Sequence, residues 1–262
     1  MNRPRNNGLR RAAAARVRLV VLPEMWPTSF ADPLEAAGEA LAATPAAVHR
    51  IGELSRELGL VAGGSAYGSA DGEAKPRNRM HVFDRGELVL SYDKVHLFSP
   101  TAEDESFSAG DEPPPTVEAS AGRLSAIVCY DLRFGPLVRV PQAEGAEILL
   151  VSAQWPATRA GHWRTLLAGR AVEAQLFVVA ANRTGTDFIG RRRLELSFPG
   201  NSCVVDPHGR VRAAGPGGAG LVRADIDLAQ VRRVRRQVLV RDDERRDLYV
   251  RWSHRRTQSD RG

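Results

Sequence analysis

Short apolar segments that alternate with helical stretches constrain the fold of this chain more than any other feature. Apolar runs of strand length recur along the sequence, and several of the stretches between them carry apolar residues at helical spacing. Strands connected through helices favour an α/β sheet, whereas the hairpins that interrupt this pattern favour antiparallel neighbours. We therefore expect a single α/β domain, built either on one mixed sheet or on two sheets with helices outside.

The positions of these elements follow from apolar runs, from glycine and proline residues that mark turns, and from capping residues. Thr44-Pro45 resembles an N-cap followed by proline at the first helical position, and Pro141 is expected to kink or shorten its helix. We expect helices at 45–58, from residue 134 and at 161–175, strands at 19–22, 60–65, 123–128, 147–152 and 176–182, a hairpin of 80–83 with 88–92, and further apolar segments at 202–205 and 221–226.

Length and composition exclude several classes of protein. The 262 residues suffice for one sizeable domain, and 43% hydrophobic with 26% charged residues is ordinary for a globular chain. No apolar run approaches the roughly 20 residues that span a bilayer, and the first residues contain no apolar core of a secretory signal. The two cysteines, Cys129 and Cys203, cannot form a disulfide framework, and no Cys/His cluster has zinc-ligand spacing. We expect a cytoplasmic protein without a membrane partner.

The positive charge of the chain comes almost entirely from arginine. The formal net charge is +6, and only two of the 37 basic residues, Lys75 and Lys94, are lysines. A composition that favours arginine explains most of this excess. A lysine retained in such a chain suggests a position that requires a compact, deprotonatable amine, since a guanidinium stays charged. Lys94 is of interest on this ground.

Three polar residues that follow predicted strands are candidates for chemistry. Cys129 lies at a strand-to-helix junction, where backbone N–H groups favour a thiolate and can receive an oxyanion. Glu24 ends a buried strand, where partial burial would suit it to act as a general base. Lys94 follows a strand and could hold an oxyanion. Each also has a structural alternative: a buried cysteine, a capping carboxylate and a solvated strand end. Cys203, inside its strand, is expected to be structural.

Three segments taken together are more specific than any single residue. LPEMWPTSF at 22–30, YDKVHLF at 92–98 and VCYDLRF at 128–134, in that order, resemble the nitrilase (carbon–nitrogen hydrolase) superfamily with its Glu-Lys-Cys triad. The resemblance continues through 151–187 and 200–211. It implies an α-β-β-α sandwich, a homodimer, and a reaction that needs neither metal nor organic cofactor.

The resemblance also implies a role for each matched residue. Cys129 would be the nucleophile, Glu24 the general base, and Lys94 with the backbone N–H of Tyr130 the oxyanion donors. The family's second glutamate matches Glu105, in a stretch with neighbouring acidic residues. Attack on an amide would release ammonia and leave a thioester, which water then hydrolyses.

The segments CYDLRF and QWP look most like the omega-amidase branch, which acts on 2-oxoglutaramate or 2-oxosuccinamate. Arg133 would bind the substrate carboxylate in a bidentate fork. Trp155 would form an apolar wall, with core packing as its alternative. Deaminated glutathione amidase and N-carbamoyl amidohydrolase of the same superfamily are the competing assignments.

The sequence departs from the family pattern at its start and at two later points. Residues 1–16 form a shortened N-terminal segment without the usual first strand and part of the first helix, 17–250 form one hydrolase domain, and 251–262 are expected to be a disordered tail. Gly135-Pro136 stands where the family usually has Pro-Glu. The stretch 188–197 replaces a shorter loop and brings Arg191–Arg193 near the expected site.

Three alternatives compete with the amidase assignment. A nucleic-acid binder would use 191–193 together with Arg232, Arg233, Arg235 and Arg236, but aromatic residues are only 6% and no binding-module motif occurs, so no nucleic-acid partner is expected. An inactive, truncated homologue is the second alternative. A papain-type hydrolase would need His162 or His208 as base, and neither lies in a matching motif.

Overall fold

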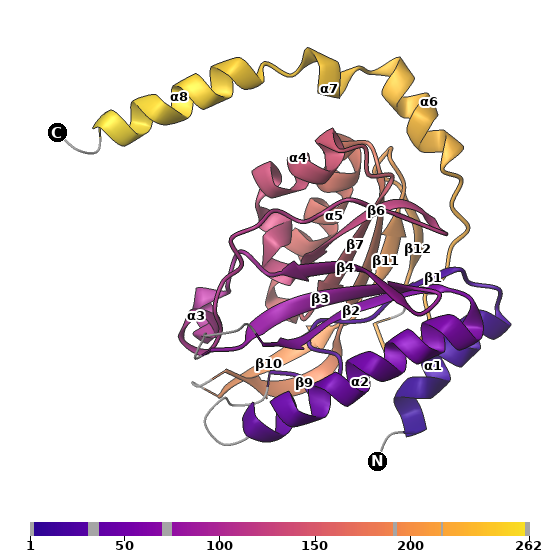
Figure 1. The fold of residues 1–262 in the computed structure, drawn as a ribbon. Helices are drawn as coiled ribbons and strands as arrows, with labels where there is room; N and C mark the ends of the chain where they lie inside the picture. The colour runs from indigo at the N-terminus through magenta and orange to yellow at the C-terminus, as the bar shows by residue number, and fades with distance from the viewer. Residues whose placement is uncertain (1–2, 31–36, 70–74, 191–192, 216, 260–262) are drawn as a thin grey trace.

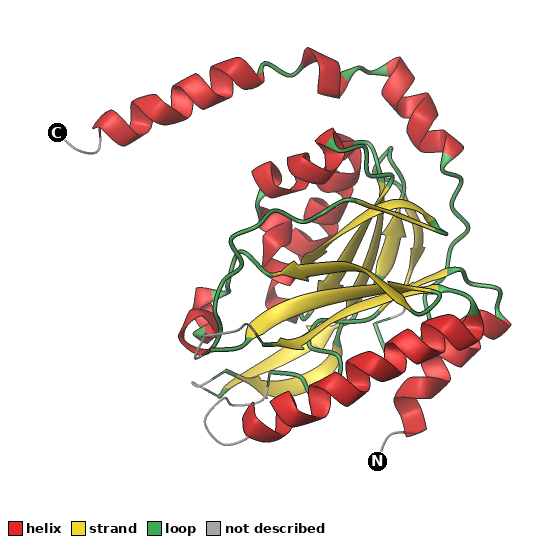
Figure 2. Cartoon of the chain, in the orientation of Figure 1, coloured by secondary structure: helices red, strands yellow, loops and turns green. Residues whose placement is uncertain are grey.

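Two β-sheets lie face to face between two layers of helices in the computed structural model, which describes residues 3–30, 37–69, 75–190, 193–215 and 217–259 (Figures 1 and 2). Helices α1 and α2 cover the four-stranded sheet, and α4 and α5 cover the six-stranded sheet. This arrangement confirms the predicted α-β-β-α sandwich and selects two sheets over a single mixed sheet.

The four-stranded sheet has the order β1-β2-β3-β4. β1 pairs parallel with β2, and the other neighbours are antiparallel. Arg85 and Gly86 both adopt positive φ, as the tight turn between β3 and β4 requires. The predicted strands are confirmed, the first ending one residue earlier and the other three being longer: β1 (Leu19–Val21), β2 (Val61–Gly68), β3 (Arg77–Asp84) and β4 (Glu87–Asp93).

The six-stranded sheet has the order β12-β11-β8-β7-β6-β5, and its β6, β7 and β8 are parallel. These three strands are largely buried, which explains why they read as continuous apolar runs. The short, partly exposed β5 and β12 were not predicted, because they carry no such run. The strands are β5 (Val117–Ala119), β6 (Gly122–Val128), β7 (Ile148–Ala153), β8 (Phe177–Asn182), β11 (Cys203–Val205) and β12 (Val211–Ala214).

A separate hairpin, β9 (Thr184–Ile189) with β10 (Leu194–Pro199), occupies the stretch that the sequence identified as an altered loop. In β10, Leu194, Leu196 and Phe198 alternate with polar residues, so the period of a strand is present in the sequence although the stretch was interpreted as a loop. Of the expected arginine cluster, Arg191 and Arg192 lie outside the described residues, and Arg193 stacks on Phe188 at 5.5 Å.

The longer helices are α1 (Arg3–Ala14), α2 (Ala37–Leu58), α4 (Gly135–Ala143) and α5 (Ala160–Ala174). The predicted start of the second helix at Pro45 was wrong, because α2 begins at Ala37 and contains this proline. Pro45 is exposed, while Ile51 and Leu54 are buried against the first sheet. Packing of that face therefore outweighs the local preference for a helix end at proline.

The C-terminal region forms an arm that is anchored to the sandwich where it begins, since Val231 and Val234 are buried and Arg235 donates to the Ala146 carbonyl, and that extends away from the sandwich only at its end (Figure 1). It contains α6 (Ala229–Gln237), α7 (Val240–Asp243) and α8 (Arg246–Ser259). The expectation of a disordered tail is therefore wrong for 251–259, which are helical, while 260–262 lie outside the described residues. The leucine, arginine and glutamine residues of α8 are good helix formers, so a high content of charged residues was not sufficient evidence for disorder.

Four short helical turns connect the strands to the site described next: η1 (Ser99–Thr101), α3 (Glu103–Ser106), η2 (Cys129–Arg133) and η3 (Ala157–Arg159). Within the described part of the chain, no helix combines the length and the apolar character that crossing a membrane requires.

Candidate active site

Glu24, Lys94 and Cys129 come together in the interior, each just beyond the end of a strand. Glu24 follows β1, Lys94 follows β4, and Cys129 opens η2 directly after β6. Their exposed fractions are 2%, 1% and 8%, respectively. Because β1 and β4 belong to one sheet and β6 to the other, the face-to-face sheets bring the three residues together.

Lys94 is held by two carboxylates. Its Nζ lies 2.9 Å from Oε1 of Glu24, and 2.9 Å and 2.7 Å from the two carboxylate oxygens of Glu103. Burial alone would lower the pKa of Lys94, but the negative charges of Glu103 and Glu24 outweigh burial and raise this pKa above its ordinary value. The ammonium therefore remains charged throughout the physiological pH range.

Glu103 occupies the position that the sequence assigned to Glu105. Glu103 is 3% exposed and also accepts the Phe98 backbone N–H at 2.7 Å, whereas Glu105 is exposed on the same short helix. The preceding Ala102 has a left-handed backbone (φ 56°), which starts α3 in the orientation that turns Glu103 inward. Burial and the nearby Glu24 charge raise the pKa of Glu103, while Lys94 opposes this rise.

Asn78, which the sequence did not single out, joins the two carboxylates. Its Nδ2 donates to Oε1 of Glu24 at 2.8 Å and to Oε1 of Glu103 at 3.2 Å. Its backbone carbonyl accepts the Lys94 N–H at 3.0 Å. The side chain is fully buried in β3, and this one residue thus bonds to both carboxylates and to the backbone of Lys94. Its only signal in the sequence is a polar residue on the inner face of a strand.

Cys129 has a strained backbone, with φ of 47° at a position that is not glycine. This conformation makes the abrupt change from β6 to η2. The thiol lies close enough to Glu24 and Lys94 for the charges of both groups to act on it. Burial and then the Glu24 charge raise the pKa of Cys129 well above its ordinary value, against the opposing effect of Lys94. The resting group is therefore a neutral thiol beside a carboxylate.

The two oxygens of Glu24 have different partners. Oε1 accepts hydrogen bonds from Lys94 and Asn78, whereas Oε2 accepts the Gln154 N–H at 2.9 Å. The Gln154 side chain in turn donates to the Glu24 carbonyl at 2.9 Å. This asymmetry leaves Oε2 with more free accepting capacity, and Oε2 is therefore the better proton acceptor for the thiol.

A buried carboxylate fixes the loop after Lys94 against the turn that carries Cys129. Asp131 accepts hydrogen bonds from the Tyr92 hydroxyl at 2.9 Å and from the His96 backbone at 3.0 Å. The Val128 N–H also donates to Asp131, at 3.2 Å. Burial and the Asp131 charge raise the pKa of Tyr92, which stays protonated as a donor. The relative positions of the ammonium and the thiol are thus fixed by hydrogen bonds.

Arg133 and Trp155 lie together on the side of η2. The Arg133 guanidinium carbon lies 4.8 Å from the centre of the Trp155 ring and 5.9 Å from that of Tyr130. One guanidinium nitrogen is 3.2 Å from Nδ1 of His162. Trp155 is 2% exposed and donates its indole N–H to the Arg159 carbonyl at 2.8 Å. The burial of Trp155 agrees with the core-packing alternative, and its role as a wall for the substrate stays a prediction.

The carbon-nitrogen hydrolase family model matches residues 7–236, which is most of the chain and includes every residue of this cluster. The chain belongs to this family. The match confirms the resemblance that the three sequence segments indicated. The protein is therefore an enzyme of a family that cleaves C–N bonds with water.

Curated relatives of this carbon-nitrogen hydrolase carry amidase names. The chain is 36% identical over 234 residues to 2-oxoglutaramate amidase of Bacillus subtilis, covering 88% of this chain and 86% of the relative. It is 37% identical over 211 residues to omega-amidase YafV of Yersinia enterocolitica, covering 80% and 77%. It is also 34% identical over 259 residues to human deaminated glutathione amidase, covering 94% and 78%.

Solved structures share the fold. A carbon-nitrogen hydrolase from Helicobacter pylori G27 has a TM-score of 0.84 at 23% identity, covering 95% of this chain and 93% of that chain. An amidase from Nesterenkonia sp. AN1 has a TM-score of 0.80 at 27% identity, covering 94% and 88%. That structure is described as carrying the acetamide moiety of fluoroacetamide covalently on its active-site cysteine.

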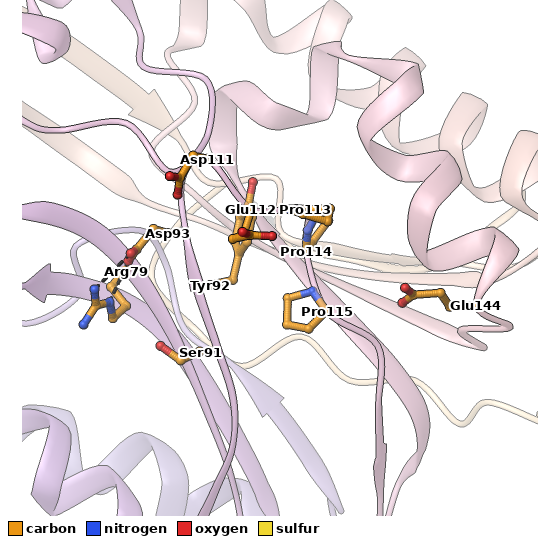
Figure 3. Close-up of a pocket in the computed structure, with 10 residues that line it drawn as sticks. All are labelled: Arg79, Ser91, Tyr92, Asp93, Asp111, Glu112, Pro113, Pro114, Pro115 and Glu144. Atoms are coloured by element: carbon orange, nitrogen blue, oxygen red, sulfur yellow. Dashed lines mark hydrogen bonds and ion pairs between the residues drawn. The ribbon is translucent and has the colours of Figure 1, made fainter. Parts of the chain in front are cut away.

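A pocket of about 450 Å³ lies apart from the cluster (Figure 3). Arg79 and Asp93 form a bidentate ion pair at its edge, with distances of 2.6 Å and 2.9 Å. Asp111 and Glu112 line the same pocket with the three prolines that follow them. None of the proposed chemical groups of this hydrolase is among its lining residues, so the pocket is separate from the candidate active site.

Proposed function

We propose that this hydrolase cleaves a small, carboxylate-bearing amide to an acid and ammonia through a cysteine thioester. The observation that carries the proposal is the buried cluster in which Glu24 acts electrostatically on the Cys129 thiol while its Oε1 is 2.9 Å from Nζ of Lys94. A neutral thiol beside a carboxylate and a fixed ammonium supplies a nucleophile, a base and an oxyanion donor in one place.

In the acylation step, Glu24 Oε2 takes the proton from Cys129 as Sγ attacks the amide carbon. The carbonyl electron pair moves to oxygen, and Lys94 with the Tyr130 backbone N–H holds the resulting oxyanion. Two Lys94 donors point to Glu103 in the resting enzyme, so one can turn to the oxyanion while the other keeps the ion pair. The intermediate collapses as the C–N bond breaks and Glu24 returns its proton to the leaving nitrogen, which departs as ammonia.

In the deacylation step, Glu24 takes a proton from water as the water oxygen attacks the thioester carbon. The same donors hold the second oxyanion. The C–S bond then breaks, the acid departs, and the proton on Glu24 returns to Sγ. Glu103 and Asn78 take no proton in this sequence; they hold Lys94 and Glu24 in position.

For the substrate, we propose the omega-amides 2-oxoglutaramate or 2-oxosuccinamate. The similarity to named 2-oxoglutaramate and omega-amidases supports this choice. Arg133 supports it independently, because a guanidinium one turn beyond the nucleophile can bind the distal carboxylate of a short substrate in a bidentate fork. The stacked Trp155 ring holds the guanidinium in place from one side.

Ammonia release from 2-oxoglutaramate by wild-type protein and Cys129→Ala tests this function. We expect release from the wild type and none from the variant, with Cys203→Ala as the matched control because Cys203 lies in β11 away from the cluster. Circular dichroism establishes that all three proteins are folded. A folded wild type that releases no ammonia from any omega-amide would overturn the substrate assignment.

Deaminated glutathione is the second candidate substrate, supported by the similarity to human deaminated glutathione amidase over 94% of this chain. It carries the same 2-oxoglutaryl group in a secondary amide, so the leaving group is the amine of cysteinylglycine in place of ammonia. The ratio of kcat/KM for the two substrates decides between them, and a ratio above about ten in favour of deaminated glutathione would replace our assignment.

We further propose that the protein is a homodimer in the cytoplasm. The C-terminal arm supports a second copy, because Tyr249 and Trp252 of α8 are 44% and 49% exposed. Light scattering after size exclusion should give a dimer for the wild type and a smaller species for Trp252→Glu. A wild-type monomer would contradict this.

The proposed location is supported by the two cysteines, which are both free, as a reducing compartment requires. Cell fractionation tests the location.

A further inference from the structure

Arg183 lies beside the cluster, and the reaction steps given above assign it no role. It is the first residue after β8, and 24% of its side chain is exposed. Its guanidinium nitrogens contact acceptors from three segments: the Gln154 side-chain oxygen at 3.0 Å, the Asp187 carboxylate at 2.7 Å, and the Ser29 hydroxyl. Because the donors of a guanidinium have fixed directions in one plane, these contacts set the relative positions of the three segments.

One side of this network reaches the proposed base. The Gln154 side chain, whose oxygen accepts the hydrogen bond from Arg183, donates its own N–H to the Glu24 carbonyl at 2.9 Å. The Gln154 backbone N–H donates to Oε2 of Glu24, also at 2.9 Å. Both residues are buried, so these bonds lie away from bulk water. Arg183 therefore acts on the Glu24 carboxylate through a single intermediate residue.

The other side of the network holds the loop that follows the base. Asp187 in β9 pairs with Arg183 and also accepts the hydrogen bond of the Ser29 hydroxyl at 2.9 Å. Ser29 has a left-handed backbone, with φ of 62°, a conformation that persists only where surrounding contacts fix it. The next residue, Phe30, places its ring centre 6.0 Å from Nζ of Lys94. The far end of this loop is thus fixed beside the ammonium.

The hydrogen bonds and the chain together form a closed ring. It runs from Glu24 through Gln154 and Arg183 to Ser29, and 24–29 close it. Moving the base therefore requires breaking bonds at one end of the loop or the other. The position of the base relative to the nucleophile affects the rate strongly, since a misplacement of about 1 Å can cost about 10²-fold.

The charge of Asp187 belongs to the same network. Burial would raise the pKa of Asp187, but the hydrogen bonds from Arg183 and Ser29 outweigh burial and lower this pKa. Asp187 is therefore an ionised partner at neutral pH, and its charge holds the guanidinium at the junction of the three segments.

We propose that Arg183 is a positioning residue for the hydrolysis: through Gln154 it holds the Glu24 carboxylate where this group can take the thiol proton. Its contact with Ser29 holds the other end of the loop. This role rests on the proposed function, in which Glu24 is the base. Lysine at this position would keep the charge but lacks the planar fork, so it would satisfy fewer of the three acceptors at once. A graded loss of kcat from arginine through lysine to methionine follows.

Steady-state hydrolysis of 2-oxoglutaramate tests this order. We expect kcat to fall about 10²-fold in Arg183→Met and about tenfold in Arg183→Lys, with KM within about threefold of the wild type in both. Arg50→Met is the matched control, because Arg50 binds two carboxylates on α2, is 33% exposed, and should leave kcat within about twofold. An unchanged kcat in Arg183→Met, or a rise in KM without a fall in kcat, would overturn the positioning role.

A double-mutant cycle tests whether Arg183 acts through Gln154. Gln154→Met removes the two side-chain hydrogen bonds and keeps the backbone N–H that binds Glu24. If Gln154 transmits the effect, adding Arg183→Met to Gln154→Met should lower kcat by no more than about a further tenfold. A further loss of about 10²-fold would mean that the two residues act independently and would overturn the connection.

Alkylation of Cys129 by iodoacetamide tests the same role without an amide substrate. Sγ displaces iodide in this reaction, and the thiol proton passes to Glu24. Intact-mass measurement in a Cys203→Ala background follows the single remaining cysteine. We expect Arg183→Met to slow alkylation at least about tenfold, and Arg50→Met to leave it unchanged.

Circular dichroism shows whether each variant is folded. If Arg183→Met is not, Ser29→Ala, which removes only one hydroxyl from the network, should still slow alkylation at least about threefold. A folded variant that is alkylated as fast as the wild type would overturn the role of Arg183. Slower alkylation in a protein whose wild type releases no ammonia from any omega-amide would overturn the substrate assignment and support the positioning role.

Discussion

Lys94 Nζ lies 2.9 Å from Oε1 of Glu24, with each side chain only 1% exposed. Removing the cation would leave two buried carboxylates, Glu24 and Glu103, facing each other without compensation. Lys94→Ala should therefore lower kcat/KM for 2-oxoglutaramate by at least about 10²-fold and the free energy of unfolding by about 3–5 kcal/mol. Ammonia release and urea unfolding measure the two effects.

The other lysine provides the control for this experiment. Lys75 is exposed and donates to the Asp104 carbonyl at 3.1 Å, so Lys75→Ala should leave both quantities within about 0.5 kcal/mol of the wild type. Equal losses in the two variants would show that Lys94 has no special electrostatic role.

The sequence assigned the family's second glutamate to Glu105, whereas the structure places Glu103 beside Lys94. Glu103→Gln weakens the buried ion pair to Lys94 at 2.7 Å, so we expect kcat to fall about 10²-fold. Glu105→Gln changes an exposed side chain on the same helix and should leave kcat within about twofold. Steady-state kinetics of the matched pair decides the matter. A larger loss in Glu105→Gln would return the role to the residue that the sequence favoured.

The sequence located the strand ends well because that information is local. Glu24, Lys94 and Cys129 each follow an apolar run, and the structure brings all three together. The choice between Glu103 and Glu105 depends instead on the left-handed turn at Ala102, which has no signal in a run of acidic residues. A periodicity argument cannot supply that orientation.

Features that depend on long-range packing could also not be predicted from the sequence. Asn78 reaches both glutamates only because β3 pairs with β2 in a register that places Asn78 opposite Tyr67. Pro45 indicated a helix start, and packing of the α2 face against the first sheet overrode it. The fold class and family were predictable from local patterns, whereas helix bounds and the positioning residues required the assembled sheets.

Asn78 should control the pH dependence of the reaction. Its Nδ2 donates to both carboxylates, and such donors favour the ionised form. Asn78→Ala removes these bonds, so the pKa of Glu103, which burial already raises, should rise further. We expect the acidic limb of the kcat/KM profile to move to higher pH, with a drop in kcat and little change in KM. A uniform loss of activity at every pH would instead indicate a purely structural role.

Arg133 should determine the affinity for the substrate carboxylate. Arg133→Met keeps an apolar side chain near Trp155 but loses the charge-assisted hydrogen bonds, which are worth about 1.5–3 kcal/mol. We expect KM for 2-oxoglutaramate to rise about 10- to 100-fold, while kcat/KM for propionamide, which has no carboxylate, stays within about threefold. Arg85→Met at the β3–β4 turn should change neither value. Parallel losses on both amides would place Arg133 outside substrate recognition.

His81 should make the stability of the fold depend on pH. Burial in β3 and the adjacent Arg79 charge lower the pKa of His81 from 6.5 to about 4, and its Nδ1 is buried without a partner in the described structure. Below pH 6.5 the unfolded chain binds a proton that the folded chain refuses, so stability from this residue is complete above that pH and is lost as the pH falls toward 4. Between about pH 7.5 and pH 5 the wild type should lose about 2 kcal/mol more than His81→Gln in urea unfolding. If both proteins lose the same amount, His81 is protonated in the folded state and the buried, neutral imidazole is excluded.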